Sequence, residues 1–366
     1  MAARPGSAFA PELQNGIARI PAALAGSVSG IGSLPFRSAD EAVQVIGAEC
    51  PDLPFWPQLP RLSEREGAIG QGLNILADLI EPRSDGYGYQ VKDGRIDSVV
   101  RALHSSSGQL TSANATGFAA FEGAMKSGDL SSALAVKGQI EGPLTLATHL
   151  FYRGRAFLAD SSLFAAVAFH VSQMACWQIE RLKLYGRPVL MFIDEPALCL
   201  DAAVSNGISL DHRLNALAAI FEDVRARDAS AGLHCCAARP FARMCGAKPD
   251  ILSFDAYQQL EEFFADSDAL EFLHNGGWIA YGMVPNSPTL QQLEAASLFG
   301  RWLMAASMAG DPQQIAQRAI ITATCGLGLL DARLVRQSFS LARAVGTLVR
   351  RLAGVDSLLF CESAHG

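Results

Sequence analysis

The stretch Pro188-Val-Leu-Met-Phe-Ile-Asp194-Glu195-Pro196 decides the fold. An unbroken apolar run that stops at two acids and a proline is typical of a buried strand in a parallel sheet. Seven other short runs of this kind recur, and the stretches between them space their apolar residues three and four apart, as amphipathic helices do. The expected strands are residues 28–33, 53–58, 135–141, 188–194, 232–236, 251–255, 278–283 and 320–325.

Eight strand–helix units in one chain predict an α/β fold, a single-domain (β/α)8 TIM barrel over residues 27–366. An open doubly wound sheet is the alternative. Residues 1–26 are expected to be an N-terminal lead-in with a short helix near 16–24. Residues 60–134 are too long for one crossover, so we predict an insertion or lid between strands 2 and 3, with a hairpin at 86–100. The helices are expected at residues 38–46, 161–185, 209–227, 289–309 and 332–352.

The composition is typical of a globular protein and argues against a nucleic-acid-binding, membrane-spanning or disulfide-rich one. Half of the 366 residues are hydrophobic and 18% are charged, enough apolar surface for a large core. The net charge of −7 and the scattered Lys and Arg residues argue against a nucleic-acid partner. No apolar run reaches the roughly 20 residues of a membrane span, and no signal-peptide pattern is visible, so we expect a soluble, cytoplasmic protein. Eight cysteines are too few for a disulfide scaffold.

The carboxyl ends of the expected strands carry polar residues. In a (β/α)8 barrel these ends form the active-site mouth, so the residues that close each run are the first candidates for function. Side chains alternate along a strand, so His234 and Cys236 point to one face while Cys235 points into the helical layer. Cys325 closes the eighth run and adds a second thiol to the same mouth.

One imidazole and two thiols form a donor set that zinc prefers, with a fourth position for water, substrate or a weak carboxylate ligand. We therefore predict a catalytic Zn²⁺ bound by His234, Cys236 and Cys325, with Asp255 as the fourth ligand. Zinc with two thiolate ligands activates water poorly but binds and acidifies a further thiol, which indicates alkyl transfer to sulfur.

The alternative is that these cysteines are ordinary buried residues and that the imidazole satisfies a local hydrogen bond. The remaining thiols are expected to be ordinary core or surface groups: Cys50, Cys176, Cys199, Cys245 and Cys361.

The acidic pair Asp194-Glu195 lies where an apolar strand breaks, above the expected mouth. One of the two is expected to bind a substrate ammonium, and the alternative is a carboxylate that caps a helix or orders a loop. Ser33, which follows Gly32, offers hydroxyl and backbone donors to a substrate carboxylate, although Gly-Ser turns are common at strand ends.

Taken together, these strand ends resemble the C-terminal catalytic barrel of cobalamin-independent methionine synthase, within a superfamily that includes uroporphyrinogen decarboxylase and corrinoid-linked thiol methyltransferases. The resemblance covers most of the chain. It implies a zinc-dependent S-methyltransferase that converts homocysteine to methionine. The segments that carry it are 31–35 (IGSLP), 142–145 (GPLT), 193–198 (IDEPAL), 234–236 (HCC) and 325–327 (CGL).

The resemblance also implies roles for single residues. Asp255 stands where the family has a glutamate as fourth zinc ligand, and the shorter side chain reduces its reach. The family's homocysteine pocket carries over as Ser33 for the carboxylate and Asp194 for the amino group. Its second acidic residue maps onto Glu64 or Glu66, of which we take Glu66. The residues expected to carry catalysis are Asp194, His234, Cys236 and Cys325.

Two departures from the family bear on the methyl donor. The chain has no room for the additional N-terminal barrel that helps the family bind polyglutamyl folate. Asn286 stands nearest the position of the histidine that protonates the departing folate, and an amide cannot act as a general acid. We therefore expect methylcobalamin, free or on a corrinoid protein, in preference to methyltetrahydrofolate. The sequence assigns no donor-binding residues.

Three rival functions remain. A corrinoid-linked enzyme acting on another small thiol, such as a coenzyme-M-like sulfonate, would not place Asp194 beside an anion. A decarboxylase of the uroporphyrinogen type would need arginines near the first strand, where only Arg37 lies. A non-enzymatic zinc store or corrinoid scaffold would leave the open fourth position and the polar mouth without a use.

Overall fold

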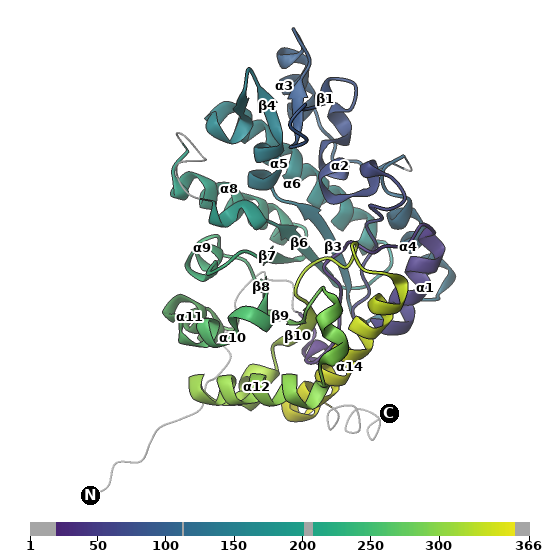
Figure 1. The fold of residues 1–366 in the computed structure, drawn as a ribbon, viewed down its shortest axis with the longest axis vertical. Helices are drawn as coiled ribbons and strands as arrows, with labels where there is room; N and C mark the ends of the chain where they lie inside the picture. Colours follow the sequence, from purple (N-terminus) through teal and green to yellow (C-terminus); the bar gives the residue numbers. More distant parts are fainter. Residues whose placement is uncertain (1–19, 112, 201–207, 356–366) are drawn as a thin grey trace, which may run out of the picture.

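The computed structural model describes residues 20–111, 113–200 and 208–355. Its centre is a parallel sheet in the order β10-β9-β8-β7-β6-β3, which curls with helices on its outer side (Figure 1). The order follows the chain without a reversal, so this sheet is not doubly wound. The six strands are β3 (Val136–Glu141), β6 (Val189–Asp194), β7 (Ser230–Cys235), β8 (Ile251–Phe254), β9 (Trp278–Val284) and β10 (Ala319–Ala323).

The first two expected strands, 28–33 and 53–58, do not form regular strands, so six of the eight expected strands are confirmed. Pro54 and Pro57 remove amide donors that a continuous ladder through the second segment would need. A complete (β/α)8 barrel therefore stays a prediction.

The two irregular segments nevertheless lie between the edges of the sheet. Val28 forms an isolated parallel bridge to Ile321 of β10, and Phe55 forms one to Lys137 of β3. A third bridge joins the two segments to each other. The gap between the first and last strands of the sheet is thus crossed by single bridges in place of ladders.

A polar contact also joins the flanks of the two irregular segments, 28–33 and 53–58, to the last helix; we call this region between β10 and β3 the seam. Arg350 donates hydrogen bonds to the carboxylate of Asp52 and to the hydroxyl of Ser27. Arg350 belongs to α14 (Ala332–Ala353), and its two partners flank the first irregular segment and the second. This contact ties the last helix to the beginning of the described chain.

The helices lie close to the ranges expected from apolar spacing. The expected helix 289–309 is divided into a 3-10 turn at Pro288–Gln292 and α12, because the chain is extended at Leu293 and Glu294. The helices that follow the central strands are α5 (Pro143–His149), α6 (Ser161–Lys183), α8 (Leu210–Arg225), α9 (Phe241–Gly246), α10 (Ala256–Ala265), α11 (Ser267–His274), α12 (Ala295–Ala309), α13 (Pro312–Ala316) and α14.

Residues 60–134 contain helices and a hairpin, and their function as a lid remains a prediction. The hairpin pairs Ile80–Pro82 with Tyr89–Val91, earlier than the expected range of 86–100. Gly86 and Gly88, with φ of 75° and 72°, lie in its turn, so the alternating pattern begins at the turn and not at the first strand. The hairpin strands are β1 (Ile80–Pro82) and β2 (Tyr89–Val91), and β2 also pairs with β4 (Leu150–Tyr152), which pairs with β5 (Arg155–Ala156). The helices in this part of the chain are α1 (Ala39–Glu49), α2 (Ala68–Leu73), α3 (Ile96–His104) and α4 (Thr116–Ser127).

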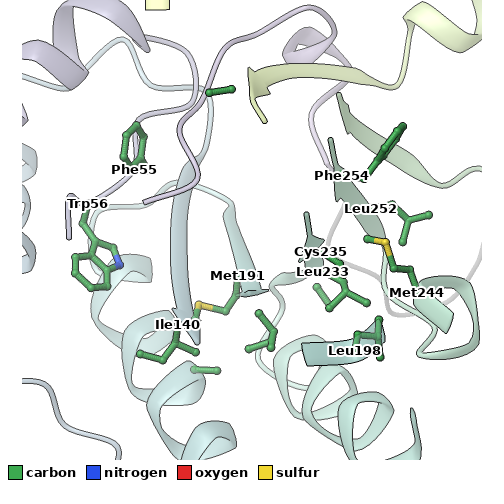
Figure 2. Packing of buried hydrophobic residues seen from close by; sticks show 14 of the residues in the cluster. Phe55, Trp56, Ile140, Met191, Leu198, Leu233, Cys235, Met244, Leu252 and Phe254 are labelled. Carbon is green, nitrogen blue, oxygen red and sulfur yellow. The ribbon is translucent and has the colours of Figure 1, made fainter. Parts of the chain in front are cut away.

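The core has two layers, one on each side of the sheet. The larger layer packs the sheet against the helices, and Figure 2 shows part of it, with Ile140 and Met191 from adjacent strands. A smaller cluster, which includes Leu190, Phe192 and Ile320, fills the inner side. Leu190 and Phe192 alternate with Met191, as strand geometry requires. None of the described helices combines the length and apolarity needed to cross a membrane.

Candidate active site

Three neighbouring strands end side by side at the candidate site. Glu141 at the end of β3 pairs with Asp194 at the end of β6, and Asp194 pairs with His234 of β7. Cys236 directly follows β7, and Cys325 lies just beyond β10. Because adjacent parallel strands lie about 4.8 Å apart, these polar side chains are concentrated at one edge of the sheet.

The predicted ligands converge. One ligand atom from each of His234, Cys236 and Cys325 lies within 4.8 Å of the others. The two sulfur atoms are 3.7 Å apart. Two thiolates on one tetrahedral zinc ion are expected about 3.8 Å apart, given Zn–S bonds of about 2.3 Å. The spacing of these residues therefore fits a zinc ion.

The imidazole of His234 is oriented for a ligand on one side only. Its Nδ1 lies 2.9 Å from the hydroxyl of Ser253 on β8. Its Nε2 is buried and has no hydrogen-bond partner among the described residues. Buried polar atoms are nearly always paired, so an unpaired nitrogen beside two thiols favours a metal-binding histidine over a purely structural one.

Replacing Ser253 with alanine is expected to weaken zinc binding by about 10- to 100-fold, because the imidazole loses the group that fixes its orientation. Competition with a chromophoric chelator would measure the affinity. Ser29→Ala is a matched control, because the Ser29 hydroxyl is also buried but bonds to the carbonyl of Leu53. Equal zinc affinity for Ser253→Ala and the wild type would contradict this orienting role.

The two thiols at the site differ in acidity. Contact with Cys236 is the main cause that lowers the pKa of Cys325 to about 4, and the nearby His234 adds to it. The same contact raises the pKa of Cys236. A metal ion that bound both sulfurs would displace any proton they carry.

Cys235 lies on the opposite face of the strand, as its position in the sequence predicted. It is fully buried in the layer between sheet and helices, where Figure 2 shows it with Leu233 and Met244. Its sulfur lies 4.0 Å from that of Cys199. Neither residue forms a disulfide. Of the other cysteines, Cys361 lies outside the described residues.

The acidic pair divides its two possible roles between its members. Both carboxylate oxygens of Glu195 accept backbone hydrogen bonds, from Leu144 at 2.8 Å and Thr145 at 2.7 Å, so Glu195 caps the start of α5. Asp194 has Oδ1 buried without a hydrogen-bond partner among the described residues. Burial raises the pKa of Asp194 to about 6, although Lys137 on β3 opposes the rise. Asp194 is therefore the member available to a substrate.

Asp255 has another use in this structure. It is the N-cap of α10 and accepts a hydrogen bond of 2.9 Å from the backbone of Gln258. It does not belong to the group of three that could hold a metal ion within the described residues. Its pKa is raised by burial, and His234 and Cys325 are close enough to affect it. Asp255 as a fourth zinc ligand remains a prediction, and its capping bond does not favour that role.

Ser33 and Asn286 both lie beside the loop that follows β10. The carbonyl of Ser33 accepts a hydrogen bond from Leu327, and its hydroxyl lies 3.3 Å from Oε1 of Gln58. The backbone of Asn286 donates to the hydroxyl of Thr324, next to Cys325. Ser33 and Asn286 thus contact Leu327 and Thr324, which are close to Cys325 in the sequence. Their roles toward substrate and donor remain predictions.

Glu66 is buried and already hydrogen-bonded. Its carboxylate accepts from the backbone of Thr116 at the start of α4, at 2.9 and 3.2 Å from its two oxygens. A carboxylate that caps a helix has less capacity to bind a substrate. Glu66 as a substrate-binding residue remains a prediction, and its observed bonds serve the fold.

Sequence reasoning gave no role to three polar residues near the site. Besides Ser253, these are Lys137 and Glu141, which lie on the same face of β3. Lys137 donates to the carbonyl of Ile31 and to Gln139, and burial lowers its pKa to about 8. The signal that could have found them is the alternation of polar residues through an otherwise apolar strand, Val-Lys-Gly-Gln-Ile-Glu.

Comparison with known proteins supports the fold and gives no sequence relative. No protein-family model matches the chain, and no curated protein matches it. Among solved structures it is similar to a B12-independent methionine synthase from Shewanella sp. W3-18-1 in complex with selenomethionine, at 13% sequence identity and a TM-score of 0.54. The match covers 89% of this chain and 98% of that chain. At this identity the likeness concerns the fold.

Proposed function

We propose that this protein is a zinc-dependent methyltransferase that moves a methyl group to the sulfur of homocysteine and releases methionine. The observation that carries the proposal is the group formed by His234, Cys236 and Cys325, in which the imidazole Nε2 is buried without a partner. Zinc with two cysteine ligands favours binding a third thiol over activating water. The solved structure with a similar fold is named as a methionine synthase bound to selenomethionine, which agrees with thiol methylation.

Four residues would form the metal site. His234, Cys236 and Cys325 would hold the metal ion, and Ser253 keeps the imidazole turned toward it. When bound, zinc would lower the pKa of the substrate thiol so that its thiolate form persists near neutral pH.

Two further residues would hold the rest of the substrate. Asp194 would bind its ammonium group, and Ser33 would bind its carboxylate. Holding both ends of a small substrate fixes the direction in which its sulfur meets the methyl group, and this positioning lowers the barrier to transfer.

The methyl donor is a separate question within this proposal. The similar structure is named as B12-independent, which gives the corrinoid donor no support. What favours a methylcorrinoid is Asn286, because methyltetrahydrofolate needs a proton when it leaves and an amide has none to give. Methyltetrahydrofolate remains the second candidate because of the fold.

The test is to incubate the zinc-loaded protein with homocysteine and either methylcobalamin or methyltetrahydrofolate, and to measure methionine. We expect methionine from at least one donor, and the productive donor identifies the reaction. Mercaptoethanesulfonate is the competing acceptor. Faster methylation of this sulfonate than of homocysteine, or no methionine with either donor, would contradict the proposal.

A further inference from the structure

Glu141 is a second carboxylate at the substrate position and has no role in the function proposed above. It ends β3 and lies directly across the parallel ladder from Asp194. Both side chains are buried, each with 7% of its surface exposed. Since paired residues of a parallel ladder point to the same face, the two carboxylates project together toward the inner side of the sheet.

Nothing in the described part of the chain neutralises this pair by direct contact. Asp194 Oδ1 is buried without a hydrogen-bond partner among the described residues. The charged neighbours that act on Glu141 are Asp194, Glu195 and Cys325, all of them acidic. Lys137 is the nearby cation, but its ammonium donates to the carbonyl of Ile31 at 2.6 Å and to Gln139 at 3.0 Å.

We infer that Glu141 and Asp194 together form the subsite for the ammonium group of the thiol substrate. The inference rests on the proposed function and makes Glu141 a determinant of substrate specificity. An ammonium carries three N–H donors and one positive charge, so it satisfies two buried carboxylates at once. A buried carboxylate pair with no bound cation is costly, so the site selects thiols that carry an amino group.

Two alternatives fit the contacts less well. A second metal ion would need a third ligand, and within the described residues only His234, Cys236 and Cys325 form a group of three. Glu66 is the other candidate for a second carboxylate, but it accepts hydrogen bonds from the backbone of Thr116.

The test compares the binding of two thiols to the zinc-loaded protein by calorimetry: homocysteine, and mercaptobutyrate, which lacks only the amino group. We expect the wild type to prefer homocysteine. Glu141→Gln should lose about tenfold or more of this preference, because it weakens binding of homocysteine alone. Glu141→Asp keeps the charge and should retain most of the preference. Zinc content and thermal unfolding serve as checks that each variant is folded and loaded.

Glu66→Gln is the variant that separates the two acidic candidates, and its preference for homocysteine should equal that of the wild type. The inference is overturned if Glu141→Gln keeps the full preference, or if Glu66→Gln loses it while Glu141→Gln does not. In these cases the proposed function still stands. If the wild type itself does not prefer homocysteine, the proposed acceptor and the inference both fail.

Discussion

Replacing Cys236 with serine is expected to remove zinc from the protein and to abolish methyl transfer. A hydroxyl does not ionise near neutral pH and is a poor zinc ligand, so His234 and Cys325 alone would hold the ion weakly. We expect zinc affinity to fall by more than ~100-fold, beyond the loss that follows removal of a group hydrogen-bonded to a ligand. Cys325→Ser should behave in the same way. Metal analysis after dialysis against a chelator measures the loss directly.

Cys235→Ala is the matched control for this prediction. Cys235 is adjacent to Cys236 in the chain but lies on the other face, in the apolar layer. The control should keep its zinc and its activity, and it should lose about 1 kcal/mol of stability because a small buried side chain is shortened. A Cys236→Ser protein that retains stoichiometric zinc and transfers methyl groups would refute the assignment of the site.

The second large effect is expected from Asp194→Asn. The change removes the negative charge that would bind the substrate ammonium, and losing a buried charge-assisted contact costs about 3 kcal/mol, roughly a 100-fold fall in kcat/KM for homocysteine. Zinc content should not change. Stability should not fall either, because Asp194 Oδ1 is buried without a partner and a neutral side chain costs less there. Steady-state kinetics and urea unfolding measure the two quantities.

Glu195→Gln should lower the stability of the fold more than it impairs substrate binding. Its amide nitrogen would face a backbone N–H of Leu144 or Thr145, where a carboxylate oxygen now accepts. We expect the free energy of unfolding to fall by about 1–3 kcal/mol, with a smaller effect on the KM for homocysteine than Asp194→Asn. If Asp194→Asn were the destabilised variant and Glu195→Gln the one with impaired substrate binding, the roles given to this pair would be reversed.

The structure brings the three expected ligands together, whereas it does not form the first two expected strands. Alternation along a single strand placed His234 and Cys236 on one face, and the position of Cys325 at another strand end placed the second thiol beside them. The first step needs only local strand geometry, and the second needs the expectation that the strand ends of a parallel barrel meet at one mouth. The irregular path of residues 53–58 depends on which amides face a neighbouring strand, and the effect of Pro54 and Pro57 becomes clear only when that neighbour is known.

Strand pattern alone did not divide the roles of Asp194 and Glu195, and only the family resemblance implied that Asp194 binds the amino group. Both are acids at the same strand end, and only the packing of α5 against that end shows which one caps the helix. Glu141 is a different case, because its position after Lys137 and Gln139 on one face of β3 was visible in the sequence. Its meaning depends on the ladder partner, Asp194, which the sequence did not identify.

The contacts that close the gap between β3 and β10, and those that form the site, join residues far apart in the sequence. The contact between Arg350 and Asp52 joins residues 298 positions apart, and the two thiols of the site are 89 positions apart. Contacts this distant in sequence form slowly, after local helices and adjacent strand pairs. During synthesis Cys236 therefore leaves the ribosome well before Cys325. Until the last strand docks, His234 and Cys236 would form only an incomplete site, so if the proposed function holds, stable zinc uptake would mark a nearly finished fold.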